Sequence, residues 1–552
     1  MPSFPPSLRL VATPLWALAR LWEWAIERQR PYLELDARGK GPGITVEQID
    51  AFTRSDARGL HLVLDGAAMG GWATLEGLRG ALGRARASGK LVTVEAGRFG
   101  NAELYLGSVA DRVWIHPTGE VAAVGVAATL MFGGGFLDKL GLKFDVEAAG
   151  AYKSFGETFS RAYSSPENRE ATRALVSDLQ AQLDAAVAEG RHLGVDAVRA
   201  ALANAPLSSG DAEAAGLVDG ALYRDQVEAQ LEGLYSDAPR RNFRIWARAH
   251  RVRRGLEQWI EGRPRVVVLH LEGNVIDGEG PDGLAIASGP VCRAIEDLRD
   301  DERVVGVVLA IRSPGGSATA SDAIWRSVRR LVEKKPVVAA FGDVAASGGY
   351  YIGVACNEIV ARAGTITGSI GVVGGKPVIG GLLDRLGVST EVVTERETAD
   401  MYSVFRPFSP PQRERFRASL DRFYRTFVDR VSAGRRAPWS AVEQHARGRV
   451  WTGTAALERG LVDHIGGVED AVARVRALTA APAVSRIDQW LTPQTPLLKR
   501  WLRRTLGADA ATALPGSSLT ARLLGQLDGV DAMLDVWQDG RPLAWLPWRV
   551  DP

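Results

Sequence analysis

Two residues far apart in the chain carry the side chains of a nucleophile and of its base. Ser347 lies in Ala346-Ser347-Gly348-Gly349-Tyr350, and Lys153 lies in Tyr152-Lys153-Ser154. A serine hydroxyl needs a base to remove its proton, and a neutral, buried lysine amine is one such base. Because no histidine accompanies Ser347 in its segment, we predict a Ser-Lys hydrolase whose catalytic groups come from different halves of the chain.

The chain contains one unit twice. Gly107 and its neighbours match Gly353 at an offset of 246 residues (353 − 107), and Pro166 matches Pro410 at an offset of 244 (410 − 166). Both units also close with the same residues, Gly-Leu-Val-Asp, at 216–219 and 460–463. A repeat this long is no solenoid period, so the pattern indicates a tandem duplication.

The two copies differ where chemistry is possible. Asn101 of the first copy occupies the place of Ser347, and the second copy has 397–399, Glu-Thr-Ala, near the place of Lys153. A single lysine is most often a solvated surface residue, and Ala-Ser-Gly-Gly alone is also typical of tight helix-on-sheet packing. The reciprocal loss of serine and lysine favours one site that is shared between the copies.

Alternating strands and helices must position these residues. In the second copy, apolar runs at 266–271, 304–311 and 336–341 predict strands, and 290–299 and 319–334 predict helices. Continuous apolar strands are typical of a parallel sheet that is buried on both faces. The sequence therefore predicts an α/β fold with mainly parallel sheets in each copy.

Five regions follow from the repeat and from changes in composition. They are an N-terminal amphipathic segment, a lysine-bearing first repeat, a basic connector, a serine-bearing second repeat and a C-terminal extension, at 1–30, 31–235, 236–263, 264–475 and 476–552. We expect the connector to be helical with a solvated face. In the extension, 542–548 suits a docked edge strand, and the basic stretch 497–504 suits either a membrane or a packed surface helix.

Glycines near Ser347 offer backbone donors. Ser347 begins a predicted helix, so the Gly348 amide is free at the helix N-terminus to stabilise an oxyanion. The turn Ser-Pro-Gly-Gly at 313–316 follows the neighbouring strand, and parallel strands bring both turns to one sheet edge. We predict Gly315 or Gly316 as the second donor. Ser369 is expected either to hold the lysine amine or to be an ordinary turn serine.

Charge and cysteine content exclude several classes. The 552 residues include 67 basic and 65 acidic side chains, and a net charge of +2 gives no reason to expect nucleic acid as a partner. Two cysteines, Cys292 and Cys356, are too few for a disulfide framework, and we expect both to be buried thiols. The seven histidines show no metal-ligand spacing. The proposed chemistry requires no metal or organic cofactor.

The N-terminal segment has a helical pattern that suits a membrane surface. Apolar residues recur at helical spacing, at Leu8, Val11, Leu15, Leu18, Trp22 and Ile26. The uncharged run 10–19 is about half the length that a spanning helix needs. A helix lying in the interface, anchored by Trp16, Trp22 and Trp24, is one interpretation, and a packing helix of a soluble protein is the other. The segment shows no apolar signal-peptide core followed by a cleavage site of small residues, so we expect this end to be retained.

The order of the repeats and the motifs Y-K-S, S-P-G-G, A-S-G-G-Y and T-G-S-I-G resemble the long, duplicated form of the signal peptide peptidase A (protease IV) family over 31–475. The resemblance implies a crotonase/Clp-protease-like fold and an endopeptidase that degrades cleaved signal peptides in the membrane. It implies a dyad of Ser347 and Lys153, with Ser369 orienting the lysine, and a homotetramer. It also implies a bacterial inner-membrane location with the catalytic domains on the periplasmic side. Long-form members usually carry an N-terminal span, whereas the segment here is short and charged.

Two other functions stay open. A crotonase-type enzyme acting on acyl-CoA thioesters would use backbone amides and acidic residues, and would not need a serine and a lysine from different copies. A non-catalytic membrane scaffold would need neither residue.

Overall fold

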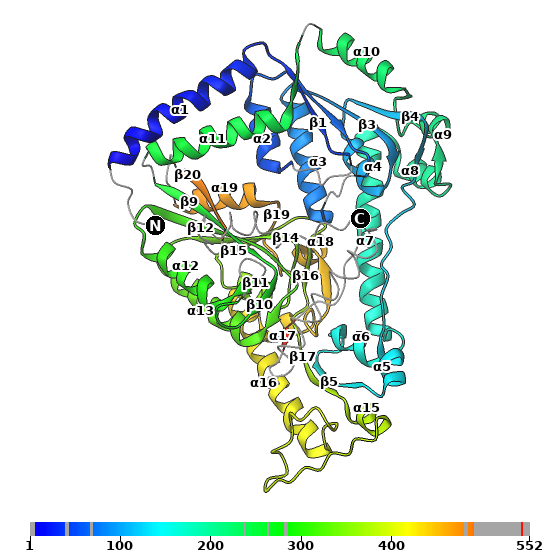
Figure 1. The fold of residues 1–552 in the computed structure, drawn as a ribbon, viewed down its shortest axis with the longest axis vertical. Coiled ribbons are helices and arrows are strands. Elements are labelled where there is room, and N and C mark those ends of the chain that lie inside the picture. The colour runs from blue at the N-terminus through cyan, green and yellow to red at the C-terminus, as the bar shows by residue number, and fades with distance from the viewer. Residues whose placement is uncertain are drawn as a thin grey trace.

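Two sheets with mostly parallel strands and one mixed sheet form the framework of the protein, and helices cover their faces (Figure 1). In this computed structural model, the described residues are 6–38, 44–66, 70–236, 238–261, 264–280, 285–479, 484–490 and 543–544. Helix α1 (Pro6–Glu27) precedes the first repeat.

The first repeat and the connector contain the elements from β1 to α11. The strands are β1 (Tyr32–Asp36), β2 (Gly59–Val63), β3 (Leu91–Phe99), β4 (Arg112–Val121), β5 (Lys143–Ala149), β6 (Leu207–Ser208), β7 (Gly220–Ala221) and β8 (Arg240–Asn242). The helices are α2 (Val46–Arg54), α3 (Trp72–Ala87), α4 (Asn101–Gly107), α5 (Gly134–Leu140), the 3₁₀ turn η1 (Ser154–Gly156), α6 (Glu157–Ser160), α7 (Pro166–Arg191), α8 (Val195–Leu202), α9 (Ser209–Ala214), α10 (Arg224–Tyr235) and α11 (Phe243–Glu261).

The second repeat and the extension contain the elements from β9 to β21. The strands are β9 (Arg265–Glu272), β10 (Asn274–Ile276), β11 (Ala285–Ala287), β12 (Val304–Ser313), β13 (Gly316–Ser317), β14 (Val337–Ala346), β15 (Glu358–Ala361), β16 (Ile366–Gly368), β17 (Val372–Val378), β18 (Val450–Thr452), β19 (His464–Ile465), β20 (Ser485–Trp490) and β21 (Leu543–Ala544). The helices are α12 (Ser288–Asp300), α13 (Ala318–Val332), α14 (Gly348–Gly353), α15 (Gly380–Arg385), α16 (Pro410–Arg435), α17 (Trp439–Glu443), α18 (Gly453–Glu458) and α19 (Val468–Thr479).

The two large sheets have the same strand order. In the first it is β6-β4-β3-β2-β1-β8, and in the second it is β18-β16-β14-β12-β9-β20. Strands β1 to β4 pair in parallel, and so do β9, β12, β14 and β16. The predicted parallel α/β architecture is therefore confirmed. Strands β8 and β20 each pair with the first strand of their repeat, so the common topology continues beyond residues 235 and 475.

Matching sequence signals start matching helices. Helices α7 and α16 each have 26 residues and proline at the first turn. The preceding serines, Ser165 and Ser409, cap them by accepting a hydrogen bond from a backbone N–H. These are the serine-proline pairs that the repeat alignment matches.

The third sheet joins the repeats. Strand β5 of the first repeat pairs antiparallel with β17 of the second over its whole length, from Ala149↔Val372 to Lys143↔Val378. Because β5 leads into the turn that carries Lys153, this pairing fixes the lysine relative to the serine-bearing repeat.

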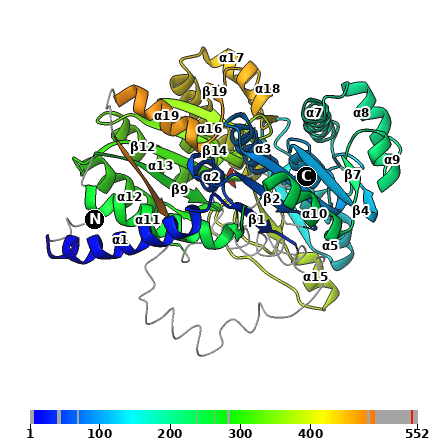
Figure 2. The same cartoon turned by 90° about the horizontal axis from the view of Figure 1, so that it is seen from above.

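The N-terminal helix lies along the connector helix. Helices α1 and α11 run side by side at one edge of the molecule in both views (Figures 1 and 2). Helix α11 confirms the predicted helical connector. Among the described residues, no helix is both long and apolar enough to cross a membrane.

Three other predictions have different outcomes. Cys356 is buried as predicted, but Cys292 is only half-buried because it lies at the edge of the buried face of α12. Residues 543–544 of the predicted edge strand 542–548 form β21. The basic stretch 497–504 lies outside the described residues.

Candidate active site

The candidate nucleophile is held in an unusual backbone conformation. Ser347 connects β14 to α14 and has φ 54° and ψ −115°. A non-glycine residue in such a region costs on the order of 1–3 kcal/mol, and such residues are concentrated at functional sites. The Ser347 N–H donates to the Gly368 carbonyl over 2.8 Å, which ties the turn to β16. The side chain is completely buried in this state.

Lys153 reaches Ser347 from the other repeat. Its Nζ lies 2.7 Å from Ser347 Oγ, 2.9 Å from Ser369 Oγ and 2.9 Å from the Ser369 carbonyl oxygen. All three side chains are buried, and Lys153 is 5% exposed. Burial lowers the pKa of Lys153 well below its ordinary value because it penalises the ammonium form. The site therefore favours a neutral amine beside the serine hydroxyl.

A backbone segment that the sequence analysis missed holds the lysine turn. The Tyr152 N–H donates to the Arg447 carbonyl over 2.8 Å, and the Ser369 N–H donates to the Arg449 carbonyl over 2.7 Å. Gly448, between them, has φ 79°, and a Cβ there would lie 2.6 Å from Lys153 Cβ. These contacts use backbone atoms and the absence of a side chain, so no residue spacing pointed to them.

The two predicted donor turns meet. A Cβ placed on Gly348 would lie 3.2 Å from Gly315 Cα and 3.3 Å from Gly316 N. Gly315 and Gly316 have φ 112° and 151°, conformations that favour glycine. The Gly315 N–H already donates to Ser313 Oγ over 3.1 Å. Of the two glycines, we therefore favour Gly316 as the donor that accompanies Gly348.

An extended segment of the chain's own tail lies beside this turn. Strand β21 pairs antiparallel with β13, where Ala544 faces Gly316. It also pairs antiparallel with β17, where Leu543 faces Val373. The gap between β13 and β17 thus accepts a strand, and strand addition is a common way to bind an extended peptide.

The matching positions of the first repeat have no nucleophile. Asn101 begins α4, donates to the Gly125 carbonyl over 2.8 Å and accepts from the Gly125 N–H over 3.2 Å. The second repeat places Glu397 and Ala399, near the position that corresponds to Lys153, in an exposed segment. One Ser-Lys pair is therefore present among the described residues of the two matching sites.

Comparison with known proteins agrees with the duplication. The sequence model of peptidase family S49 matches twice, at residues 84–236 and 329–481. The chain belongs to peptidase family S49. The two matches of this S49 peptidase are offset by 245 residues (329 − 84), which confirms the tandem repeat.

Named relatives are proteases. The S49 peptidase is 30% identical over 442 residues to the chloroplastic serine protease SPPA of Arabidopsis thaliana, covering 78% of this chain and 64% of that one. It is 29% identical over 416 residues to Protease 4 of Haemophilus influenzae, covering 73% and 67%. The chain thus spans about two thirds of the length of these relatives. Among solved structures, ClpP1 of Listeria monocytogenes is 14% identical, with a TM-score of 0.26, covering 39% of this chain and 98% of that chain.

Proposed function

We propose that this S49 peptidase is a serine endopeptidase whose dyad, Ser347 and Lys153, is assembled across its two repeats. The observation that carries the proposal is the 2.7 Å separation between Lys153 Nζ and Ser347 Oγ. Burial of the lysine supports its role, because an amine accepts a proton only when it is neutral.

The proposed reaction has two stages. Lys153 takes the proton of Ser347 as Oγ attacks the peptide carbonyl, and the oxyanion accepts hydrogen bonds from the amides of Gly348 and Gly316. The protonated lysine then gives its proton to the leaving amine, and an ester to Ser347 remains. Lys153 next activates a water, which attacks the ester and releases the acid.

Ser369 has a positioning role in this proposal. Its hydroxyl and its carbonyl oxygen both lie 2.9 Å from Lys153 Nζ, on a residue with φ 52°. The two N–H bonds of the neutral amine are donated to these two acceptors, so that its single lone pair points at Ser347. The turn-serine alternative does not account for this double contact.

The proposed substrates are cleaved signal peptides or other hydrophobic peptides from membranes. The similarity to Protease 4 and SPPA supports this class, and the strand position between β13 and β17 suits an extended chain. A homotetramer at the bacterial inner membrane, with periplasmic catalytic domains, is proposed on the family resemblance alone. A thioesterase or a scaffold has no observation in its favour at this site.

A serine-directed fluorophosphonate tests the proposal. We expect one adduct, mapped by mass spectrometry to Ser347, together with loss of peptide hydrolysis. Ser347→Ala should not be labelled, and Lys153→Met should be labelled far more slowly. Turnover of acyl-CoA thioesters without peptide hydrolysis would contradict a protease.

A further inference from the structure

A cluster of three polar side chains joins the repeats beside the lysine turn. Tyr152 directly precedes Lys153, Glu170 lies on α7, and Arg449 directly precedes β18. The Tyr152 hydroxyl donates to Glu170 Oε2 over 2.9 Å. Arg449 Nη1 donates to Glu170 Oε1 over 2.6 Å and to the Tyr152 hydroxyl over 3.3 Å. Each of the three side chains therefore contacts the other two, and the contacts cross from the first repeat to the second.

Two aromatic rings, one from each repeat, hold the guanidinium of Arg449. Its Cζ lies 4.9 Å from the centroid of the Tyr152 ring and 4.5 Å from that of Trp451 on β18. A planar guanidinium is stabilised by stacking on aromatic faces, and more so where it is partly removed from water. The Arg449 side chain is 20% exposed, whereas that of Glu170 is 54% exposed. The rings thus fix the arginine more firmly than an ion pair with an exposed carboxylate does alone.

The backbone of Arg449 reaches the dyad by a second route. Its carbonyl oxygen accepts from the Ser369 N–H over 2.7 Å. Ser369 in turn accepts from Lys153 Nζ at its hydroxyl and at its carbonyl oxygen, over 2.9 Å each. Ser369 has φ 52°, a conformation that a non-glycine residue keeps only when its surroundings hold it. Arg449 therefore contacts both Tyr152, the residue before the lysine, and the residue whose two acceptors orient the amine.

We propose that Arg449 is a positioning residue that sets the distance and direction between Lys153 Nζ and Ser347 Oγ. Its side chain fixes the lysine turn through Tyr152, its carbonyl fixes Ser369, and it takes no part in proton transfer itself. This inference rests on the Ser-Lys mechanism proposed above. Because a misplacement of about 1 Å at a reacting pair can cost about 100-fold in rate, loss of this support should slow the attack by Ser347.

Two ion pairs of the same short segment allow a matched comparison. Arg449 pairs with Glu170 of the other repeat, whereas Arg447 pairs with Glu443 of its own repeat, at 2.9 Å between Nη2 and Oε2. Glu170→Ala and Glu443→Ala therefore make the same chemical change beside the same segment. Only Glu170→Ala disrupts the cluster that holds Tyr152, so only this variant should slow the reaction.

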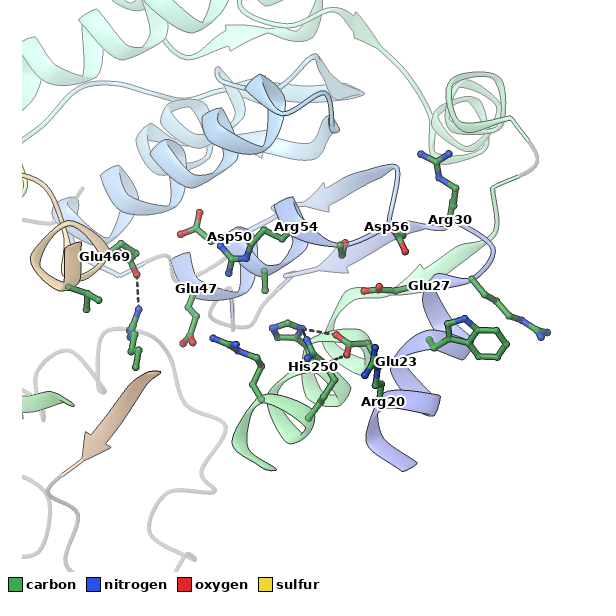
Figure 3. A pocket seen from close by; sticks show the side chains of 18 of the residues that line it. Arg20, Glu23, Glu27, Arg30, Glu47, Asp50, Arg54, Asp56, His250 and Glu469 are labelled. Atoms are coloured by element: carbon green, nitrogen blue, oxygen red, sulfur yellow. Dashed lines mark hydrogen bonds and ion pairs between the residues drawn. The ribbon is translucent and has the colours of Figure 1, made fainter. Parts of the chain in front are cut away.

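A buried ion pair in another part of the molecule supplies a control for stability. Glu23 of α1 pairs with His250 of α11, at 2.6 Å between Oε1 and Nδ1, and also with Arg253. These groups line a cavity of about 1210 Å³ between α1, α2, α11 and α19, in which Glu23 points at His250 (Figure 3). The described residues that line this cavity include no member of the cluster or of the dyad. Glu23→Gln should therefore lower the melting temperature without slowing the reaction.

Arg449→Met tests the proposal through the rate at which a fluorophosphonate labels Ser347. Methionine keeps much of the side-chain length but donates to neither Tyr152 nor Glu170. We expect the labelling rate and kcat for a soluble peptide to fall about 10- to 100-fold, with little change in KM. Arg449→Lys should recover only part of this loss, because lysine lacks the planar group that stacks between the rings.

Milder variants give the same test with less risk to the fold. Tyr152→Phe removes one oxygen, and we expect it and Glu170→Ala to lose about 3- to 10-fold each, as for one hydrogen bond. Tyr152→Phe should add little to the loss in Arg449→Met, because the cluster acts as a unit. Wild-type labelling rates in both Tyr152→Phe and Glu170→Ala would overturn the proposal, as would an equal loss in Glu443→Ala.

A background without the lysine separates positioning from a general effect on the fold. Labelling of Lys153→Met should already be slow, and adding Arg449→Met should slow it no further, because the arginine acts through the lysine. A wild-type labelling rate in Arg449→Met would overturn the positioning role and leave the dyad standing. The same loss from Arg449→Met in both backgrounds would also overturn it, since Arg449 would then support only the fold. Labelling of Lys153→Met at the wild-type rate would instead contradict the dyad on which the inference rests.

Discussion

The two repeats use the same strand-turn-helix in different ways. In the second, Ser347 has φ 54° and its Oγ lies against Lys153 Nζ. In the first, Asn101 does not adopt a positive φ, and its amide forms two hydrogen bonds with Gly125. The second repeat thus has a strained turn with a hydroxyl beside the lysine, and the first has a turn whose side chain makes only backbone hydrogen bonds.

The glycine turn before α3 of the first repeat also differs from the matching turn before α13 of the second. In the second repeat, the turn at Gly316 lies next to β21. In the first, the N-terminus of α3 is occupied by a carboxylate of the other repeat. The Thr74 N–H and hydroxyl donate to Asp343 over 2.7 and 2.8 Å. A Cβ on Gly71 would lie only 2.5 Å from Asp343 Cγ. This contact joins the two repeats.

Removing the nucleophile should reveal the largest difference in activity between matched changes in the two repeats. Ser347→Ala is expected to lower kcat/KM for a peptide by about 10⁴- to 10⁶-fold, because the acyl-enzyme no longer forms. The matched change in the first repeat, Asn101→Ala, should keep activity. It should lower the free energy of unfolding by about 1–3 kcal/mol, because Gly125 loses its partners. Steady-state kinetics and thermal unfolding measure both. A folded, active Ser347→Ala protein would contradict the mechanism.

Changing the base should be nearly as damaging. Lys153→Arg is expected to lose about 10²- to 10⁴-fold in kcat, as much as Lys153→Ala, because arginine does not deprotonate in a protein. Lys376 is a matched control, since it is also buried but donates to the Met401 carbonyl. Lys376→Arg should alter stability and leave the chemistry intact. Near-normal turnover by Lys153→Arg would reduce Lys153 to a structural role.

Disturbing the backbone behind the lysine should have an intermediate effect. Gly448→Ala places a methyl group against Lys153 on a residue with φ 79°, so we expect roughly a 10- to 100-fold loss of kcat. Gly460→Ala is the control, because Gly460 also has positive φ, 66°, but has nothing within 4 Å of an added Cβ. It should lower the melting temperature without changing kcat. Equal kinetic losses in the two variants would mean that strain alone explains them.

Restoring serine to the first repeat should have no effect on activity. In an Asn101→Ser, Ser347→Ala double mutant, the new hydroxyl has no lysine, and the neighbouring turn is filled by Asp343. We expect neither hydrolysis nor fluorophosphonate labelling at position 101. Labelling there would show that the first repeat kept a working site.

The sequence predicted the elements whose signals are local. Apolar runs predicted the parallel strands β9, β12 and β14, and the reciprocal loss of serine and lysine predicted that Ser347 and Lys153 would meet. Contacts made by backbone atoms left no such signal. The pairing of β5 with β17 and the fit of Gly448 against Lys153 depend on how the repeats pack.

The lysine also makes stability depend on pH. Burial disfavours its ammonium form, so the folded state binds this proton less readily than the unfolded state. Stability should therefore rise as pH increases from the lowered pKa of the folded state to the ordinary lysine pKa. Lys153→Met should remove this part of the pH dependence, which urea unfolding at several pH values measures. An unchanged slope would indicate that Lys153 is not titrating in this range.

The rate of Ser347 acylation as a function of pH tests the central claim most directly. Labelling by a fluorophosphonate, whose reactivity does not need protonation of a leaving amine, isolates the step in which Lys153 accepts the proton. We predict that the wild-type rate rises with pH and levels off around a pKa well below that of an ordinary lysine, because burial favours the neutral amine. Lys153→Met should be slow and should lack this transition. The same rate and the same transition in Lys153→Met would contradict a base contributed by the other repeat.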